Sequence, residues 1–303
     1  MTLVPEATTF LRAAGYSGAL VCIGAVAARQ LIHRNWSEEK DRDIRESALR
    51  RLGQVAFGAA LLIPVALLAE LRAQASQLVD EGETLGRAHY AMALASRWGT
   101  GLKTQGVAAI FAVIAWIPWR GRPWLGWKLA PLAALALAAT MPLTGHARAM
   151  FHGSVLGVLT GACHVIGAGL WLGTLVVLAC TAWLGPADGR VVRVTKVITA
   201  FSPIALVGAS LTGLSGVISG WQTVGSFNAL TGTDYGRTLL VKLCCLGGVA
   251  ALGAFNWKVV QPKLEAGAGD DLLRRSAWTE LALGALLLIV TAVLVALPAP
   301  GME

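Results

Sequence analysis

Long apolar runs alternate with short polar connections along the chain, and this pattern predicts its secondary structure. About 20 apolar residues suffice to cross a hydrocarbon core of roughly 30 Å as a helix. The runs here are continuous instead of alternating at every second residue, as the strands of a membrane barrel do. We therefore predict an all-α, polytopic membrane helix bundle with about eight transmembrane helices, forming a single integral membrane domain over residues 1–303. The expected spans lie near residues 10–32, 52–71, 100–119, 124–144, 154–183, 198–220, 237–257 and 276–297.

One connection departs from this pattern. Residues 71–98 are polar enough to leave the membrane, yet Leu85, Ala88, Met92 and Ala95 recur at helical spacing. This spacing is typical of an amphipathic helix that lies on a bundle or at the membrane interface. We expect an external amphipathic segment here.

The composition supports the same class of protein. Of the 303 residues, 55% are hydrophobic and 14% charged, and the mean hydropathy is +0.63. Short loops leave no room for a large extramembrane catalytic domain. The sequence contains no GxxxxGK[ST], GxSxG or HExxH motif, so an ATP-driven pump is unsupported. We expect a transporter-like membrane protein and not an enzyme, with redox activity left open.

The net charge of +8 reflects an excess of Lys and Arg in the loops on one side of the membrane. We therefore expect no nucleic-acid partner. Of the 25 Lys and Arg residues, 17 lie in or beside the loops that follow spans 1, 3, 5 and 7, against 6 on the other face. The positive-inside rule then places both termini outside and the basic set in the cytoplasm. The first ten residues have no basic region before an apolar core, so we expect no cleaved signal peptide.

Histidine and methionine gather in the external half. His146 and His152 lie in or beside the loop between spans 4 and 5, His89 lies on the external amphipathic segment, and Met141 and Met150 lie within five residues or so of an external histidine. Imidazole and thioether groups are ligands that copper favours, so this set predicts a copper site. The alternative is that methionine only fills gaps between packed helices.

His164 lies about ten residues into span 5, roughly 15 Å below the external surface at 1.5 Å per residue. An ionisable group at this depth is costly and usually faces the bundle interior. Trp171, seven residues on, returns to the same helix face. The alternative is a single buried histidine bonded to a neighbouring helix.

Three further charged groups lie in or beside the spans. Lys242, near the external end of span 7, either snorkels to the interface or pairs with Glu70 at the outer end of span 2. Glu280 lies near the cytoplasmic start of span 8, where a helix N-terminus favours an acid, so we assign it no functional role.

Several separated motifs carry a family resemblance. They are TGHA (144–147), HVIGAGLWLG (164–173), FSP (201–203), LTG (211–213), TDYGR (233–237), LLVK (239–242), Asn256, Pro262 and RSAWTE (275–280). Together they resemble the copper resistance D (CopD/PcoD) family. The motifs cover spans 4 to 8, while the first three spans match only as a general pattern.

The resemblance implies a bacterial inner-membrane protein of eight helices that moves copper, with a periplasmic CopC-like protein as partner. Some relatives carry that partner as a fused domain, and the stretch before the first span here is too short to contain it. His146, His164 and Trp171 fall at characteristic family positions. We hypothesise that copper, as Cu(I) or Cu(II), is received by His146, His152 and His89 with Met150 or Met141. It then reaches His164 between spans 4, 5 and 7.

Two other classes of protein remain open. A haem-binding or redox membrane protein would use His146, His152 or His164 as an axial ligand to a b-type haem. A structural or assembly subunit would bind neither copper nor haem. An absorption spectrum distinguishes the first of these, because haem gives a Soret band.

Overall fold

The computed structural model describes residues 7–80, 82–117, 123–144, 155–181, 190–266, 270–297 and 300. Every regular element in these ranges is helical, which confirms the predicted all-α class. The long helices are α1 (Ala7–Asn35), α2 (Arg42–Ser76), α4 (Arg97–Trp116), α5 (Pro123–Thr140), α7 (Val155–Ala168), α9 (Arg190–Val224), α11 (Asp234–Phe255) and α13 (Asp270–Ala296). The shorter elements are η1 (Glu39–Asp41), α3 (Arg87–Ala95), η2 (Met141–Thr144), η3 (Gly169–Gly173), α8 (Thr174–Thr181), α10 (Phe227–Gly232), η4 (Asn256–Val260) and α12 (Gln261–Glu265).

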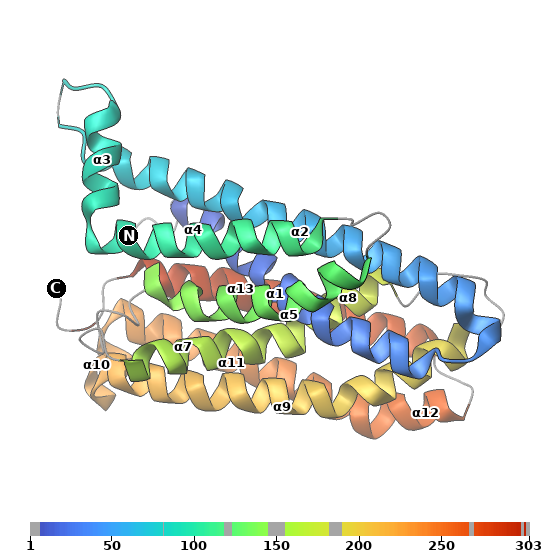
Figure 1. Cartoon of the computed structure of the whole chain (residues 1–303). Helices are drawn as coiled ribbons and strands as arrows, with labels where there is room; N and C mark the ends of the chain where they lie inside the picture. The colour runs from blue at the N-terminus through green and yellow to red at the C-terminus, as the bar shows by residue number, and fades with distance from the viewer. Residues whose placement is uncertain are drawn as a thin grey trace.

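Seven helical segments of the described chain are long and apolar enough to cross a membrane, against the eight that we predicted. The difference falls on α4, the third predicted span. It is a helix of 20 residues, but Lys103, Thr104 and Gln105 make its first half less apolar. Because α4 packs alongside α2 and α5 within the bundle (Figure 1), it belongs to the same layer of long helices. The polytopic helix bundle is therefore confirmed.

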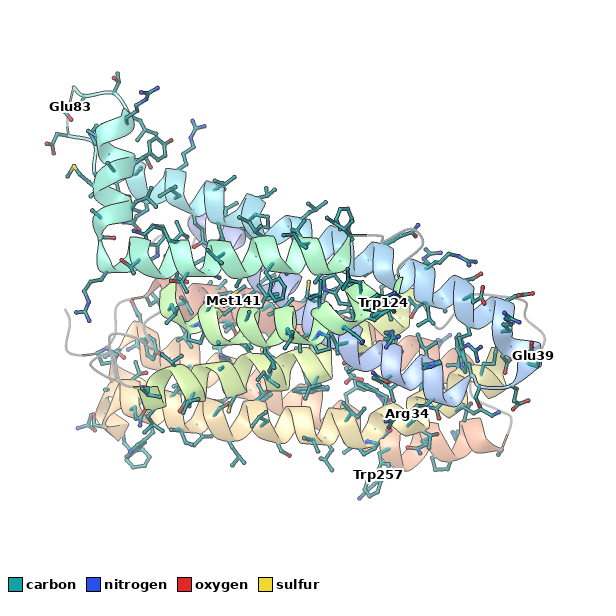
Figure 2. All side chains as sticks on the ribbon, viewed as in Figure 1. Arg34, Glu39, Glu83, Trp124, Met141 and Trp257 are labelled. Carbon is teal, nitrogen blue, oxygen red and sulfur yellow. The ribbon has the colours of Figure 1, made fainter. Side chains whose placement is uncertain are left out.

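The long helices run up and down, so that connections alternate between two ends of the bundle. Helices α3 and α10 lie at one end, and α12 lies at the opposite end (Figure 1). Glu83 beside α3 and Glu39 in η1 mark these two ends (Figure 2). The predicted basic cytoplasmic face corresponds to the end that carries η1 and α12.

The predicted amphipathic segment 71–98 is only partly helical. Helix α2 continues to Ser76, and a separate helix, α3, has 9 residues and packs against α2 and α4. Ala93 on α3 is buried, whereas Met92 is 57% exposed. This segment therefore forms a short helical cap at one end of the bundle.

Helix α1 lies at the centre of the bundle, and glycines allow its close approach to η3. A Cβ atom on Gly24 would overlap the backbone of Gly173 and Thr174, and one on Gly173 would overlap the backbone oxygen of Leu20. The Thr174 hydroxyl, fully buried, donates to the Gly24 carbonyl at 3.4 Å. Such backbone contacts between small residues are a main source of helix association in membranes, where the hydrophobic effect between helices is absent.

At the opposite face of the same segment, α7 crosses α9 equally closely. A Cβ atom on Gly167 would lie 2.6 Å from the Gly208 carbonyl oxygen and 2.5 Å from the Thr212 hydroxyl. The α7–η3 segment is therefore held between α1 on one side and α9 on the other.

Polar contacts attach the first connection to the start of α9. The Trp36 indole N–H donates to the Arg193 carbonyl at 3.0 Å, and Arg45 donates to the Trp36 carbonyl at 2.7 Å. Lys196 pairs with Glu38 at 2.7 Å. These contacts fix the basic end of α9 against α1 and α2.

The close contact between α1 and η3 predicts that one added methyl group at Gly173 strongly lowers the stability of the protein. We expect Gly173→Ala to lower the free energy of unfolding by about 1–3 kcal/mol, because its Cβ must displace the α1 backbone. Thermal unfolding in detergent measures the change. Gly58→Ala on α2 is the control, since a Cβ there meets no atom within 4 Å; equal melting temperatures for the two variants would contradict the close-packing argument.

The topology prediction is tested by labelling single cysteines in a chain whose five native cysteines are replaced. Ser226→Cys, exposed beside α10, should react with an impermeant maleimide in intact cells. Glu39→Cys, exposed in η1, should react only after the membrane is permeabilised. The reverse pattern would invert the predicted orientation.

Candidate functional site

His164 lies on α7 and faces the inside of the bundle. Its Nδ1 atom is 3.2 Å from the Ser215 hydroxyl of α9, and its ring edge lies against Gly216. Lys242 of α11 is close enough to act on His164 electrostatically. The structure therefore surrounds His164 with α9 and α11, whereas the sequence hypothesis placed it between spans 4, 5 and 7 and omitted span 6, which is α9.

Glu70 does not serve as the counter-ion of Lys242. Its carboxylate lies 3.6 Å from the Arg12 guanidinium of α1, beside Tyr16. Glu70 is 7% exposed, so this pair is partly shielded from solvent and joins α1 to α2. The pair with Arg12 replaces the alternative in which Glu70 and Lys242 bind each other.

His89 and Met141 are both engaged in hydrogen bonds, His89 within its own segment and Met141 with another helix. The Gly86 N–H donates to His89 Nδ1 at 3.1 Å, and His89 Nε2 lies 3.2 Å from a Glu83 carboxylate oxygen, so the ring closes the start of α3. The Gln105 amide donates to the Met141 sulfur at 2.9 Å. Met141 is only 1% exposed and lies within the bundle (Figure 2).

The remaining predicted ligands, His146, Met150 and His152, lie outside the described residues. Among the residues that are described, no three His, Cys, Asp or Glu side chains group closely enough to hold a metal ion. His89, Met141 and His164 contact different elements: the start of α3, α4 and α9.

A second polar site, which the sequence analysis did not assign, centres on Glu280 of α13. The Trp171 indole N–H donates to Glu280 Oε1 at 3.3 Å. The Asn256 amide donates to Glu280 Oε2 at 3.0 Å, and Ser276 in turn donates to the Asn256 carbonyl oxygen. Glu280 is 6% exposed and Trp171 4%, so the carboxylate is held inside the bundle.

Two π-helical turns supply the donors at this site. Trp171 lies in η3 and Asn256 lies in η4, and both elements are π-helical turns of five residues. Such turns are rare and occur frequently at functional sites. Each one is flanked by α-helix on both sides, so the wider turn changes the direction of the side chains at one point of an otherwise regular span.

A cavity of about 600 Å³ lies beside Glu280. It follows α11 and η4 from Val249 to Val260, and α9 closes its other side. Its walls are mostly apolar, and Trp171, Asn256 and Glu280 contribute its buried polar groups together with a few other side chains. The FSP motif of α9 lines the same cavity, through Phe201, Ser202 and Pro203.

The signal for this site was present in the motifs. Trp171, FSP, Asn256 and Glu280 all belong to the separated motifs that carry the family resemblance, and the structure brings them to one cavity. In the sequence, the start of a helix was enough to explain an acidic residue at position 280. Only the fold shows that Trp171 and Asn256 donate hydrogen bonds to its carboxylate.

The fold and these two polar sites define a multi-pass helical membrane protein with ionisable groups inside its bundle. Residues 3–158, about half of the chain, match the N-terminal domain of copper resistance protein D-like proteins, and residues 195–294 match copper resistance protein D. The chain therefore belongs to the copper resistance protein D family, as its motifs indicated. The match also extends to the first three spans, where the motifs showed only a general pattern.

The chain is also similar to the copper transport protein CutJ of Bacillus subtilis (strain 168), with 30% identity over 179 residues. The aligned part is 58% of this chain and 31% of CutJ, so the chain spans about a third of that relative's length. No solved structure matches the chain.

The Glu280 site predicts different effects for two substitutions. Glu280→Ala leaves the Trp171 and Asn256 donors without their acceptor, so we expect a loss of about 1–3 kcal/mol in stability. Glu280→Gln keeps one carbonyl oxygen and the side-chain volume, so its loss should be smaller. Melting temperatures in detergent decide this, and equal values for the two variants would contradict the hydrogen-bond assignment.

Proposed function

We propose that this chain carries copper across the bacterial inner membrane, as a transporter and not as an enzyme. The observation that carries the proposal is His164, an imidazole held inside a helix bundle by Ser215 in a protein of the copper resistance family. Copper homeostasis is the role that the family name indicates, and the transport name of the similar Bacillus protein favours movement of the metal across the membrane.

His164 has an arrangement suited to a metal ligand. A ligating histidine is usually oriented by a hydrogen bond from its other ring nitrogen, and such partners raise metal affinity by about 10–100-fold. Ser215 provides this contact at Nδ1, so copper would bind through Nε2. A neutral imidazole is a ligand type that copper accepts.

In this proposal, the segment that contains His146, Met150 and His152 receives copper on the external side. In the sequence, this segment lies between Thr144 of η2 and α7, the helix that carries His164. His89 and Met141 would act as ligands only after exchanging their present hydrogen bonds with Gly86, Glu83 and Gln105. We therefore rank His89 and Met141 below the other four candidate copper ligands, which are His146, Met150, His152 and His164.

The side on which copper enters is inferred from the predicted topology, and the partner is the one that the family resemblance implies. With the basic end in the cytoplasm, the segment 145–154 faces the periplasm, where a CopC-like copper-binding protein would deliver the metal. The two ends of the bundle, marked by Glu83 and Glu39 (Figure 2), are then the entry and exit sides for copper.

Copper binding to purified variants tests the proposal. We expect His164→Ala and His146→Ala each to lose copper, and Ser215→Ala to weaken binding by about 10-fold. His33→Ala, an exposed histidine at the basic end of α1, is the control and should bind copper as the parent chain does. Copper analysis and competition with a chelator give stoichiometry and affinity.

Copper uptake into proteoliposomes should be lost in His164→Ala and His146→Ala and reduced in Ser215→Ala. Uptake by His33→Ala should equal that of the parent chain. Unchanged copper stoichiometry and affinity in both alanine variants would overturn the site. A Soret band in protein purified without added metal would instead favour the haem alternative.

A further inference from the structure

We propose that Glu280 is a proton-exchange site that couples proton movement to the transport of copper. The inference rests on the proposed function, because copper is the cargo whose movement the proton would drive. The ligand of the site is a proton, and the cavity beside Glu280 is the route by which water would deliver it.

The first support is a buried carboxylate with neutral neighbours. An ionisable group inside a membrane protein is expensive and usually pairs with an opposite charge or takes part in ion or proton movement. Glu280 contacts Trp171 from η3 and Asn256 from η4, both uncharged. No described Lys or Arg forms an ion pair with it, in contrast to Glu70, which binds Arg12.

The charged and titratable groups around Glu280 are few in the part of the chain that is described. Lys258 of η4 and Arg275 on α13 itself are exposed, and Lys242 of α11 lies beside His164 instead. Helices α1 and α8 also pack against α13, and no titratable side chain among their described residues acts on Glu280. The protonation of Glu280 is thus set by Trp171, Asn256 and burial, without a fixed counter-charge.

Trp171 and Asn256 can donate hydrogen bonds to Glu280 in both its ionised and its neutral form. Burial favours the neutral acid, whereas two N–H donors favour the carboxylate. Each carboxylate oxygen keeps one further lone pair that the N–H groups leave unused, so a proton from water can bind either oxygen without displacing Trp171 or Asn256. In this step, the carboxylate accepts a proton from a hydronium ion, which leaves water and a carboxylic acid, and the acid later returns the proton to water as hydronium.

The cavity supplies access toward the cytoplasmic end. Trp257 and Trp278, 64% and 68% exposed, project outward near the polar site, as aromatic side chains do at a membrane interface. Trp257 points away from the bundle on its lower side, in the half that leads toward Glu39 of η1 (Figure 2). The cavity extends from Val260 near this level to Val249 deeper in α11, so Glu280 lies within reach of interfacial water.

The cavity chemistry does not suit copper itself. Its lining contains no His, Cys or Met among the described residues, and its polar groups are a carboxylate, amides, hydroxyls and an indole. Soft Cu(I) favours sulfur and imidazole ligands. A proton therefore fits the Glu280 site better than the cargo does.

The connection to copper runs along one helical segment. His164 and Trp171 are seven residues apart, about 10 Å along the α7–η3 axis. A carboxylate accepts a stronger hydrogen bond than a neutral acid, so protonation of Glu280 weakens its hold on Trp171. Because α7 runs without a break into η3, a change in the position of Trp171 is passed along the same helical segment to His164.

Proteoliposomes with an imposed pH gradient test the coupling. Copper uptake by the parent chain should change several-fold when the gradient is reversed, and Glu280→Gln should remove this response while copper binding at His164 stays unchanged. Glu280→Asp keeps a carboxylate and should restore part of the response. Glu70→Gln removes another buried carboxylate and should respond as the parent chain does.

A Glu280→Gln variant that responds to the gradient as the parent chain does would overturn the inference. So would a parent chain that transports copper with no dependence on the gradient, and that result would leave the proposed function intact.

Infrared difference spectroscopy provides a readout that needs no transport. A component of the protonated-carboxyl band that appears on acidification of the parent chain, is lost in Glu280→Gln and is kept in Glu70→Gln would establish the proton site even if copper transport were not observed. Absence of any such band in the parent chain would overturn the proposal, and a band that persists unchanged in Glu280→Gln would do the same.

Discussion

The close contact between Gly24 of α1 and Gly173 of η3 determines how the rest of the bundle is arranged. Neither residue has room for a Cβ, and Gly167 makes a similar contact with Gly208 of α9 on the other side. Because the α7–η3 segment is held on two faces, its rotation is fixed. Trp171 then projects toward Glu280 of α13, and His164 projects toward Ser215 of α9. Both polar sites depend on one clamped helix.

The two sites differ in chemistry in a way that suits two different ions. His164 presents an imidazole among apolar helices, a ligand that copper accepts, whereas Glu280 presents a carboxylate with neutral donors and no cation. His164 lies on α7 and contacts α9, whereas Glu280 contacts η3 and η4, the turn that leads into α12. In the proposed coupling, the two ions would bind at separate sites that the α7–η3 segment joins.

Much of the fold was predictable from the sequence, because membrane insertion requires long apolar helices whatever their partners are. The all-α bundle is confirmed. The one difference in span number falls on α4, where Lys103, Thr104 and Gln105 dilute an otherwise apolar run. Gln105 is explained only by tertiary contacts: its amide binds the Met141 sulfur and its carbonyl oxygen accepts from Thr144. No periodicity in α4 indicates that partner.

The site was predictable only in part, for a physical reason. Residue type and depth identified His164, since a histidine inside an apolar span is costly and therefore conspicuous. Pairings between spans are set by helix rotation, which depends on glycine contacts between segments far apart in the chain. Those contacts decided that Glu70 binds Arg12, that α9 supplies the partner of His164, and that Glu280 meets Trp171 and Asn256. By itself, the sequence determined the class of protein, its family and its candidate copper ligands; the tertiary structure decided which buried charges meet, because helix packing selects the facing side chains.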